Sequence, residues 1–162
     1  MPERKTVVVL AGPNGAGKTT TAGGLLLDLG VTEFVNADII EREITTPEDG
    51  PQQFAAGRLM LSRIDELALR GESFAFETTL ASRTFVPMLR GLMANSYESH
   101  LVYVWLRSPD MAIDRVAARV TLGGHHVPSD VIRRRYQRGL KNFFTLYQPL
   151  VDSWRVYDNS GR

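Results

Sequence analysis

An eight-residue segment near the start of the chain, Gly12 to Thr19 (GPNGAGKT), constrains the fold most strongly. It matches the phosphate-binding loop pattern G-x-x-x-x-G-K-[ST] at every position. The preceding run, Thr6–Ala11, is short, apolar and β-branched, which predicts a buried strand. The following run, Thr19–Leu29, predicts a helix with Leu25, Leu26 and Leu29 on its apolar side. A strand, a glycine-rich turn and a helix in this order predict a site for a nucleoside triphosphate.

The chemistry of this loop assigns roles to its residues. Glycines let backbone N–H groups converge on phosphate oxygens, and the helix N-terminus adds a partial positive charge. Lys18 is expected to reach the β- and γ-phosphates, and the Thr19 hydroxyl is expected to ligate Mg²⁺. We therefore expect ATP and Mg²⁺ as cofactors, bound by Gly12, Pro13, Asn14, Gly15, Ala16, Gly17, Lys18, Thr19 and Thr20.

Composition indicates one globular domain over residues 1–162. The apolar fraction is 43% and the charged fraction 23%, which are ordinary values for such a domain. A net charge of +1 argues against a general nucleic-acid binder, so no nucleic-acid partner is expected. There is no cysteine, no signal-peptide pattern and no apolar run of transmembrane length. We expect a cytoplasmic protein that has no membrane partner.

Strand and helix patterns alternate along the chain, which predicts a parallel sheet with helices on both faces. The expected fold class is α/β: a three-layer P-loop NTPase fold with a five-stranded parallel sheet. The expected helices are 19–29, 52–70, 83–95, 109–122 and 129–147. The expected strands are 6–11, 33–36, 73–77, 100–106 and 154–157.

Two acids lie at or just after the carboxyl ends of predicted strands, where ligands bind in such folds. Asp38 could take the proton of a substrate hydroxyl, bind the Mg²⁺ shell through water, or cap the helix that follows. Glu77, followed by Thr78, could hold substrate hydroxyls or shape the water shell of the metal; alternatively, it is a solvent-facing strand end. We predict Asp38, Glu77 and Thr78 as substrate-binding residues, with Asp38 also catalytic.

Basic residues concentrate between Arg115 and Lys141, with seven in this stretch and few acids near them. Helix, glycine break and helix over residues 119–138 predict an arginine-rich lid that closes over a triphosphate. Arginines of a lid can bind phosphate in a bidentate fashion and stabilise transition-state charge, although two or three of these are expected to be solvated surface. Ile132, Tyr136 and Leu140 form the apolar face of the second helix. The pair His125-His126 is expected to lie in a loop or to contact phosphate rather than to bind a metal. Five aromatic residues are expected to pack in the core or beside the nucleotide base: Phe143, Phe144, Tyr147, Trp154 and Tyr157.

Five segments together resemble the zeta-toxin family of P-loop kinases, in particular its short members described as predicted ATPases. These segments are AGPNGAGKTT at 11–20, NADII at 36–40, FETTL at 76–80, RVTLGGHHVPSDVIRRRY at 119–136 and VYDNS at 156–160. The resemblance implies transfer of the γ-phosphoryl group of ATP to a substrate hydroxyl. The best-known substrate of the family is UDP-N-acetylglucosamine, and an antitoxin protein is the implied partner.

The resemblance also implies roles for single residues. Asp38 resembles the general base, Glu77 a substrate-contacting acid, and Arg119 a lid arginine that neutralises phosphate. For the second lid arginine we favour Arg135 as catalytic, with Arg134 as the alternative nucleotide contact. Two other functions remain open: an ATP-driven switch with a protein partner, and a nucleic-acid end kinase.

Overall fold

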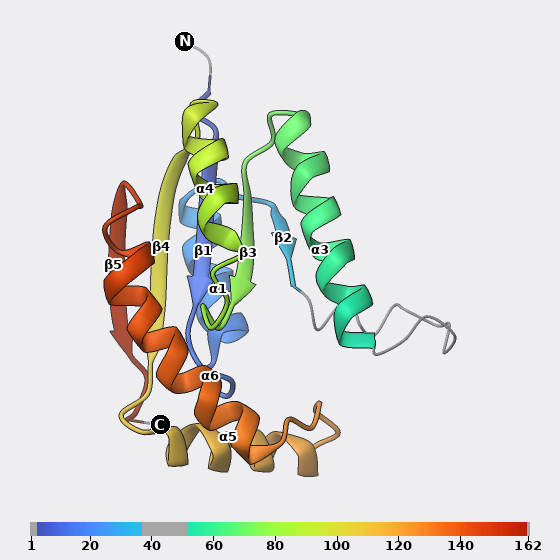
Figure 1. The fold of residues 1–162 in the computed structure, drawn as a ribbon, viewed down its shortest axis with the longest axis vertical. Helices are drawn as coiled ribbons and strands as arrows, with labels where there is room; N and C mark the ends of the chain where they lie inside the picture. Colours follow the sequence, from blue (N-terminus) through green and yellow to red (C-terminus); the bar gives the residue numbers. More distant parts are fainter. Residues whose placement is uncertain (1–2, 37–51, 162) are drawn as a thin grey trace.

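A parallel β-sheet organises the protein. The computed structural model describes residues 3–36 and 52–161. The strands are β1 (Thr6–Ala11), β2 (Glu33–Val35), β3 (Phe74–Thr78), β4 (Glu98–Trp105) and β5 (Ser153–Asp158). They form one five-stranded sheet in the order β2-β3-β1-β4-β5, and all neighbouring strands are parallel (Figure 1). The predicted α/β fold with a five-stranded parallel sheet is confirmed.

The helices lie between the strands, close to where the sequence predicts them. They are α1 (Lys18–Asp28), α3 (Gln52–Leu69), α4 (Phe85–Ala94), α5 (Pro109–Thr121) and α6 (Ser129–Asn142). Helix α5 begins with Pro109 in its first turn, after Ser108, whose hydroxyl accepts a hydrogen bond from Met111 N. The last predicted helix changes character at its end, because residues Phe143–Tyr147 form a π-helix, η1, in which Gln148 N donates to Phe143 O.

Both faces of the sheet are covered, which gives the predicted three layers. Odd-numbered residues of β1, such as Val7 and Val9, pack in one core with side chains from α3, α4 and η1. Even-numbered residues, such as Val8 and Leu10, pack in the other core with side chains from α1, α5 and α6. This alternation follows from the two-residue period of a strand whose two faces are both buried.

Helix α6 and η1 connect the two cores. Ile132 and Tyr136 of α6 are buried in the core that contains α1 and α5. Phe143 and Tyr147 of η1 are buried in the core on the other side of the sheet. The α6–η1 segment therefore passes from one face of the sheet to the other, beyond the carboxyl ends of the central strands (Figure 1).

Several predicted core positions are wrong. Leu29, at the C-cap of α1, is 39% exposed. Leu59, which helical spacing in the predicted helix 52–70 places on one apolar face with Ile64 and Leu67, is 50% exposed. Ile64 and Leu67 of α3 are buried, as their helical spacing predicts, and Ala56 and Met60 are buried with them. Of the aromatic residues, Phe143 and Tyr147 are buried as expected, whereas Phe144, Trp154 and Tyr157 are exposed. The two in β5 are exposed because β5 is an edge strand and all six of its residues are accessible.

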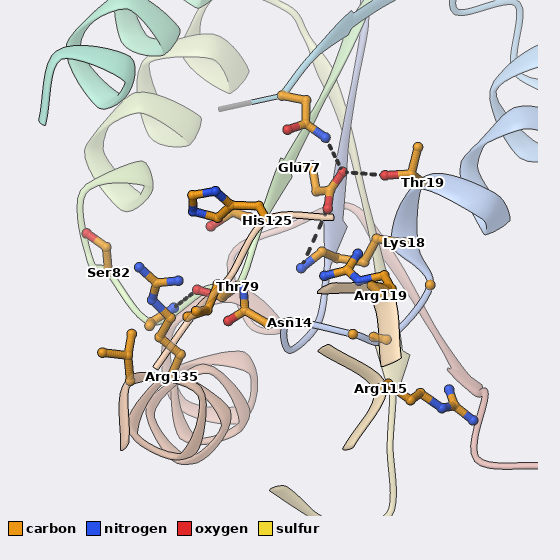
Figure 2. A pocket seen from close by; sticks show the side chains of 18 of the residues that line it. Asn14, Lys18, Thr19, Glu77, Thr79, Ser82, Arg115, Arg119, His125 and Arg135 are labelled. Carbon is orange, nitrogen blue, oxygen red and sulfur yellow. Dashed lines mark hydrogen bonds and ion pairs between the residues drawn. The ribbon is translucent and has the colours of Figure 1, made fainter. Parts of the chain in front are cut away.

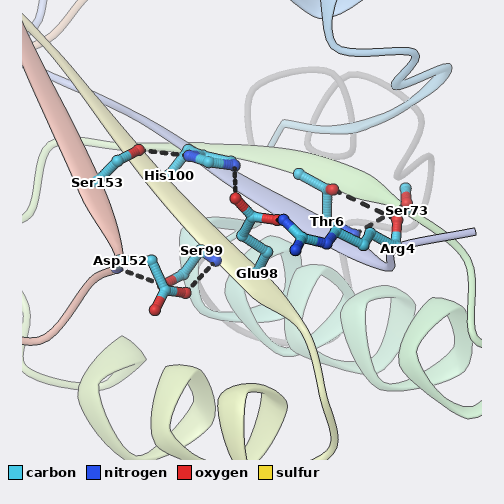
Figure 3. A network of polar contacts seen from close by, with 8 residues as sticks. All are labelled: Arg4, Thr6, Ser73, Glu98, Ser99, His100, Asp152 and Ser153. Atoms are coloured by element: carbon cyan, nitrogen blue, oxygen red, sulfur yellow. Dashed lines mark hydrogen bonds and ion pairs between the residues drawn. The ribbon is translucent and has the colours of Figure 1, made fainter.

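Polar side chains at the amino ends of β1, β4 and β5 contact one another (Figure 3). Asp152 Oδ2 accepts hydrogen bonds from Ser99 N at 2.8 Å and from Ser99 Oγ at 3.0 Å. Arg4 donates to Glu98, and the His100 ring contacts both Glu98 and Ser153. These contacts join neighbouring strands at the amino end of the sheet.

Within the residues that the structure describes, no helix is long and apolar enough to cross a membrane.

Candidate active site

The phosphate loop lies at the carboxyl end of β1, and its glycines adopt conformations that other residues rarely do. Gly12, Gly15 and Gly17 have φ values of 145°, 80° and 86°. A Cβ at position 12 would overlap the carbonyl oxygen of Val104, and one at position 15 would lie 2.9 Å from the carbonyl oxygen of Ala112. Backbone geometry and close packing against β4 and α5 therefore both require glycine in this loop.

Lys18 is held inside the loop. Its side chain is 6% exposed, and its Nζ donates to Gly12 O at 2.6 Å and to Pro13 O at 3.4 Å. The same Nζ lies 3.7 Å from Glu77 Oε1 at the end of β3. A lysine ammonium in this position is an oriented positive charge beside the N-terminus of α1.

Glu77 is the acid around which the polar side chains of the loop gather (Figure 2). Its Oε2 accepts from Thr19 Oγ1 at 3.2 Å and from Asn36 Nδ2 at 2.6 Å. The order of the strands explains why these residues meet, because β3 pairs with β1 on one side and with β2 on the other. One carboxylate is thereby placed against Lys18, Thr19 and Asn36, which come from two further elements of the fold.

Helix α5 packs directly on the phosphate loop. A Cβ on Gly15 would meet Arg115 Cβ at 3.1 Å and Val116 Cγ2 at 3.4 Å. Arg119 lies one helical turn after Arg115, so both belong to the same side of the helix. Both line the same cleft as the loop. The sequence predicts Arg119 as a site residue but not Arg115; the spacing of four residues is the signal that could have found it.

The cleft has a volume of about 1120 Å³ and lies over the carboxyl ends of the central strands. Its basic lining residues come from the loop, from α5, from the segment between α5 and α6, and from α6: Lys18, Arg115, Arg119, His125, Arg134, Arg135 and Arg138. Arg133 is outside this set, and its Nη2 pairs with Asp110 Oδ1 at 2.6 Å. The arginine-rich segment of the sequence thus contributes to both a cleft and an outer surface.

The structure places most predicted site residues in this cleft. The predicted residues that line it are Asn14 to Thr20, Glu77, Thr78, Arg119, Arg134 and Arg135. Gly12 and Pro13 do not line it, but their carbonyl oxygens accept hydrogen bonds from Lys18 Nζ. The hydroxyl of Thr78 accepts from Leu80 N at 3.1 Å, so it also shapes the turn after β3. Asp38 lies outside the described residues, and its predicted role as base remains a prediction.

Other residues of the site were not predicted from the sequence. Asn159 Nδ2, just after β5, donates to Ala16 O at 2.7 Å, and Asn159 N donates to Trp105 O at 2.9 Å. Asn36 is part of the motif at the end of β2, but its contact with Glu77 depends on strand order. Thr79 and Ser82 also line the cleft. Only the three-dimensional arrangement brings these positions together.

The donor set fits a magnesium nucleotide. Mg²⁺ prefers hard oxygen ligands, and the Thr19 hydroxyl and the Glu77 carboxylate supply them side by side. The positive φ values of Gly12, Gly15 and Gly17 permit the tight turn in which backbone N–H groups can face phosphate oxygens. Among the described residues, Asn14 Oδ1 is the buried side-chain polar atom that has no hydrogen-bond partner. A bound molecule with a donor group would satisfy this oxygen.

The fold and this site define a P-loop kinase-like domain. The chain belongs to the AAA domain family AAA_33, whose model matches residues 7–146. A relative from Haemophilus influenzae, described as an uncharacterized protein, is 24% identical over 129 residues, which are 80% of this chain and 91% of the relative.

Two solved structures show the same fold. A chain of the PezAT chromosomal toxin-antitoxin system of Streptococcus pneumoniae has a TM-score of 0.73 and 16% identity, with 97% of this chain and 68% of that chain covered. The shikimate kinase of Acinetobacter baumannii, in complex with shikimate, has a TM-score of 0.56 and 21% identity, with 94% and 84% covered. Kinases are thus among the proteins that share this architecture.

Proposed function

We propose that the protein is an ATP-dependent phosphotransferase that transfers the γ-phosphoryl group to a hydroxyl of a small molecule. The observation that carries this proposal is the cluster of Lys18, Thr19 and Glu77 at one wall of a cleft whose other walls carry arginines. Phosphoryl transfer depends mainly on positioning and on neutralising charge on the transferred group. A glycine-rich loop that faces several positively charged side chains supplies both the positioning and the charge neutralisation.

In this reaction the acceptor oxygen forms a bond to the γ-phosphorus, and the bond from that phosphorus to the β-phosphate oxygen breaks. The acceptor proton goes to a base, for which Asp38 is our candidate, and ADP is released. Lys18, Arg119 and Arg135 are proposed to stabilise negative charge on the phosphoryl oxygens, with Arg134 as an additional nucleotide contact. Thr19 and Glu77 are proposed to hold Mg²⁺, directly or through water, which supplies further charge neutralisation.

The finer proposal is a zeta-toxin-like kinase. Its support is the set of motifs that resemble that family, together with the fold shared with a chain of a toxin-antitoxin system. We propose UDP-N-acetylglucosamine as the first acceptor to test, with Glu77 and Thr78 as acceptor contacts, and an antitoxin protein as partner. We also propose that residues 1–162 act as one domain and that the protein works in the cytoplasm.

The test is mass spectrometry of a metabolite extract to which UDP-N-acetylglucosamine has been added. The extract is incubated with Mg·ATP and either the protein or its Lys18→Ala variant. A species heavier by one phosphoryl group, formed only with the unmodified protein, identifies the acceptor and supports the proposal. ATP consumption without a phosphorylated product would instead support a hydrolysing switch.

A second experiment separates the proposed roles of Asp38 and Arg119. Asp38→Asn should retain ATP binding but lose turnover, because the amide cannot accept the acceptor proton. Arg119→Ala should lower the rate more than it weakens ATP binding. Normal turnover in the Asp38 variant would contradict its assignment as base, and an unchanged rate in the Arg119 variant would assign that residue to the surface.

A further inference from the structure

The turn that follows β5 reaches across the end of β4 to the phosphate loop. In the sheet, β4 lies between β5 and β1, the strand that leads into the loop. Asn159 N donates to Trp105 O at 2.9 Å, so the backbone of this asparagine continues the pairing of β5 with β4. Its side chain reaches further, because Nδ2 donates to Ala16 O at 2.7 Å. One residue therefore joins the phosphate loop to the edge of the sheet.

The contact between Asn159 and the loop is close and specific. Ala16 is buried, and its carbonyl oxygen can only accept a hydrogen bond, so the side-chain atom that meets it must be the amide nitrogen. The same nitrogen would lie 2.8 Å from a Cβ on Gly17. Asn159 therefore packs against the peptide unit between Ala16 and Gly17 as well as donating a hydrogen bond to it.

This hydrogen bond fixes the direction of the next N–H group in the loop. A trans peptide unit is planar, so the carbonyl of Ala16 and the N–H of Gly17 point in opposite directions. Because Ala16 O is directed at Asn159, the Gly17 N–H is directed away from it. Gly17 lines the cleft, and Asn159 is not among the described residues that do. The N–H of Gly17 is therefore turned toward the side of the loop where the triphosphate is proposed to bind.

We infer that Asn159 is a positioning residue for the nucleotide: by holding Ala16 O, it keeps the N–H of Gly17 aimed at a phosphate oxygen. This inference rests on the proposed function for the identity of the ligand. Backbone N–H groups of such a loop cradle the α- and β-phosphates. These groups carry negative charge before transfer as well as during it, so loss of Asn159 should weaken nucleotide binding more than it slows the chemical step.

The first test compares AMP-PNP, a non-hydrolysable ATP analogue, with inorganic pyrophosphate, which has neither base nor ribose. Calorimetry measures the binding of each ligand, with Mg²⁺, to the original protein and to Asn159→Ala. We expect the variant to bind both ligands about tenfold more weakly, as for the loss of one hydrogen bond to a charged group. The matched control is Ser160→Ala, which removes the hydrogen bond from Arg107 N to Ser160 Oγ in the same turn and should leave both affinities unchanged.

The two ligands and the control separate the possible outcomes. Weaker binding of AMP-PNP with unchanged binding of pyrophosphate would overturn the inference, because Asn159 would then contact the base or the ribose. Equal losses in the Ser160 variant would overturn it as well, since the whole turn would be responsible. A protein that needs Asn159 to bind both ligands, yet transfers no phosphoryl group to any acceptor, would support the inference and refute the proposed function. Failure of the original protein to bind either ligand would refute both.

The second test uses the original protein, so it does not depend on the folding of a variant. NMR spectra of the backbone amides are recorded with and without pyrophosphate and Mg²⁺. We expect the amide proton of Gly17 to shift downfield on binding, as for an N–H that donates to a phosphate oxygen. A Gly17 signal that does not move when pyrophosphate binds would overturn the inference.

Steady-state kinetics give a third readout. Asn159→Ala should raise the KM for ATP about tenfold and lower kcat by a smaller factor, because the contact is made to phosphates that are not transferred. A variant in which kcat falls while KM is unchanged would assign Asn159 to the chemical step and contradict its role in positioning the loop.

Discussion

The two ends of the sheet hold similar kinds of side chains but use them differently. At the amino ends, Ser99 and Asp152 bind each other, and Glu98 lies between Arg4 and His100 (Figure 3). At the carboxyl ends, glycines are held in left-handed conformations, and arginines from two helices share one cleft (Figure 2). A buried amide oxygen, Asn14 Oδ1, also lies there without a partner.

This difference distinguishes polar groups that stabilise the fold from polar groups that are available to bind a ligand. Polar groups that satisfy one another join strands and need no ligand. A buried polar atom without a partner and accumulated charge of one sign cost stability, and a site that retains them is typically one that binds something. The carboxyl end of the sheet is therefore the functional end, in agreement with the general position of ligands in open α/β sheets. The following substitutions test this distinction.

Lys18→Ala should have the largest effect, because it removes the charge held inside the phosphate loop. We expect phosphoryl transfer to fall about 10³-fold or more, equivalent to about 4 kcal/mol of transition-state stabilisation. The matched control at the amino edge is Lys5→Ala, whose ammonium lies 4.9 Å from the ring centre of Tyr97. Transfer rates of the two variants provide the comparison. A Lys18 variant that retains a tenth of the original rate would contradict the assignment.

Glu77→Gln should lower transfer about 10²-fold and raise the Mg²⁺ concentration needed for half-maximal rate, because a neutral amide is a poorer magnesium ligand. Glu98→Gln, at the opposite edge, should leave both quantities unchanged. The measurement is the rate as a function of Mg²⁺ concentration. An unchanged magnesium dependence in the Glu77 variant would leave this residue with a purely structural role beside Lys18.

Asp152→Ala should reverse the pattern, with an effect on stability and none on catalysis. The substitution leaves the N–H and hydroxyl of fully buried Ser99 without their acceptor, which should lower the free energy of unfolding by about 2 kcal/mol. Urea unfolding measures this loss, and the transfer rate of the folded variant serves as the second readout. A reduced rate at unchanged stability would refute the division between the two edges.

Tyr147→Phe should have the smallest effect, about 1 kcal/mol, because it removes one hydrogen bond between η1 and Ser82 O. Burial raises the pKa of Tyr147 to about 12. Since the folded state favours the neutral hydroxyl, this residue stabilises the fold fully below about pH 10, and the contribution is lost as pH rises through 12. Urea unfolding between pH 9 and 12 should therefore show a smaller decline in the variant than in the original protein.

The sequence predicts the fold well because its signals are local. A glycine loop between an apolar strand and a helix, and alternating strand and helix patterns, define the layers without knowledge of distant contacts. Burial of particular side chains was less predictable. Leu59 fits a helical apolar stripe with Ile64, but the packing of α3 buries Met60 and leaves Leu59 exposed. Trp154 and Tyr157 look like core residues, yet their strand lies at the edge of the sheet.

The candidate site, like the burial of side chains, could be predicted only in part from the sequence. Lys18, Thr19, Arg119 and Glu77 follow from motifs, and the structure places all four in one cleft. The contact of Asn36 with Glu77 could not be predicted, because it depends on β2 lying beside β3. Helical spacing places Arg135 and Arg138 on one face of α6, and both line the cleft. Spacing could not show that Arg134 also lines it, whereas Arg133 is paired with Asp110 of α5.

The hydrogen bond from Asn159 to Ala16 has a consequence for how the protein is made. Its two partners are 143 positions apart in the chain. During synthesis the phosphate loop emerges early, but this contact cannot form until at least residue 159 has been added and has left the ribosome. Nucleotide binding should therefore mature late, after the sheet has assembled through β5, because long-range contacts form only once the intervening chain can close. Nascent chains that end before this asparagine should fold in part and bind nucleotide poorly.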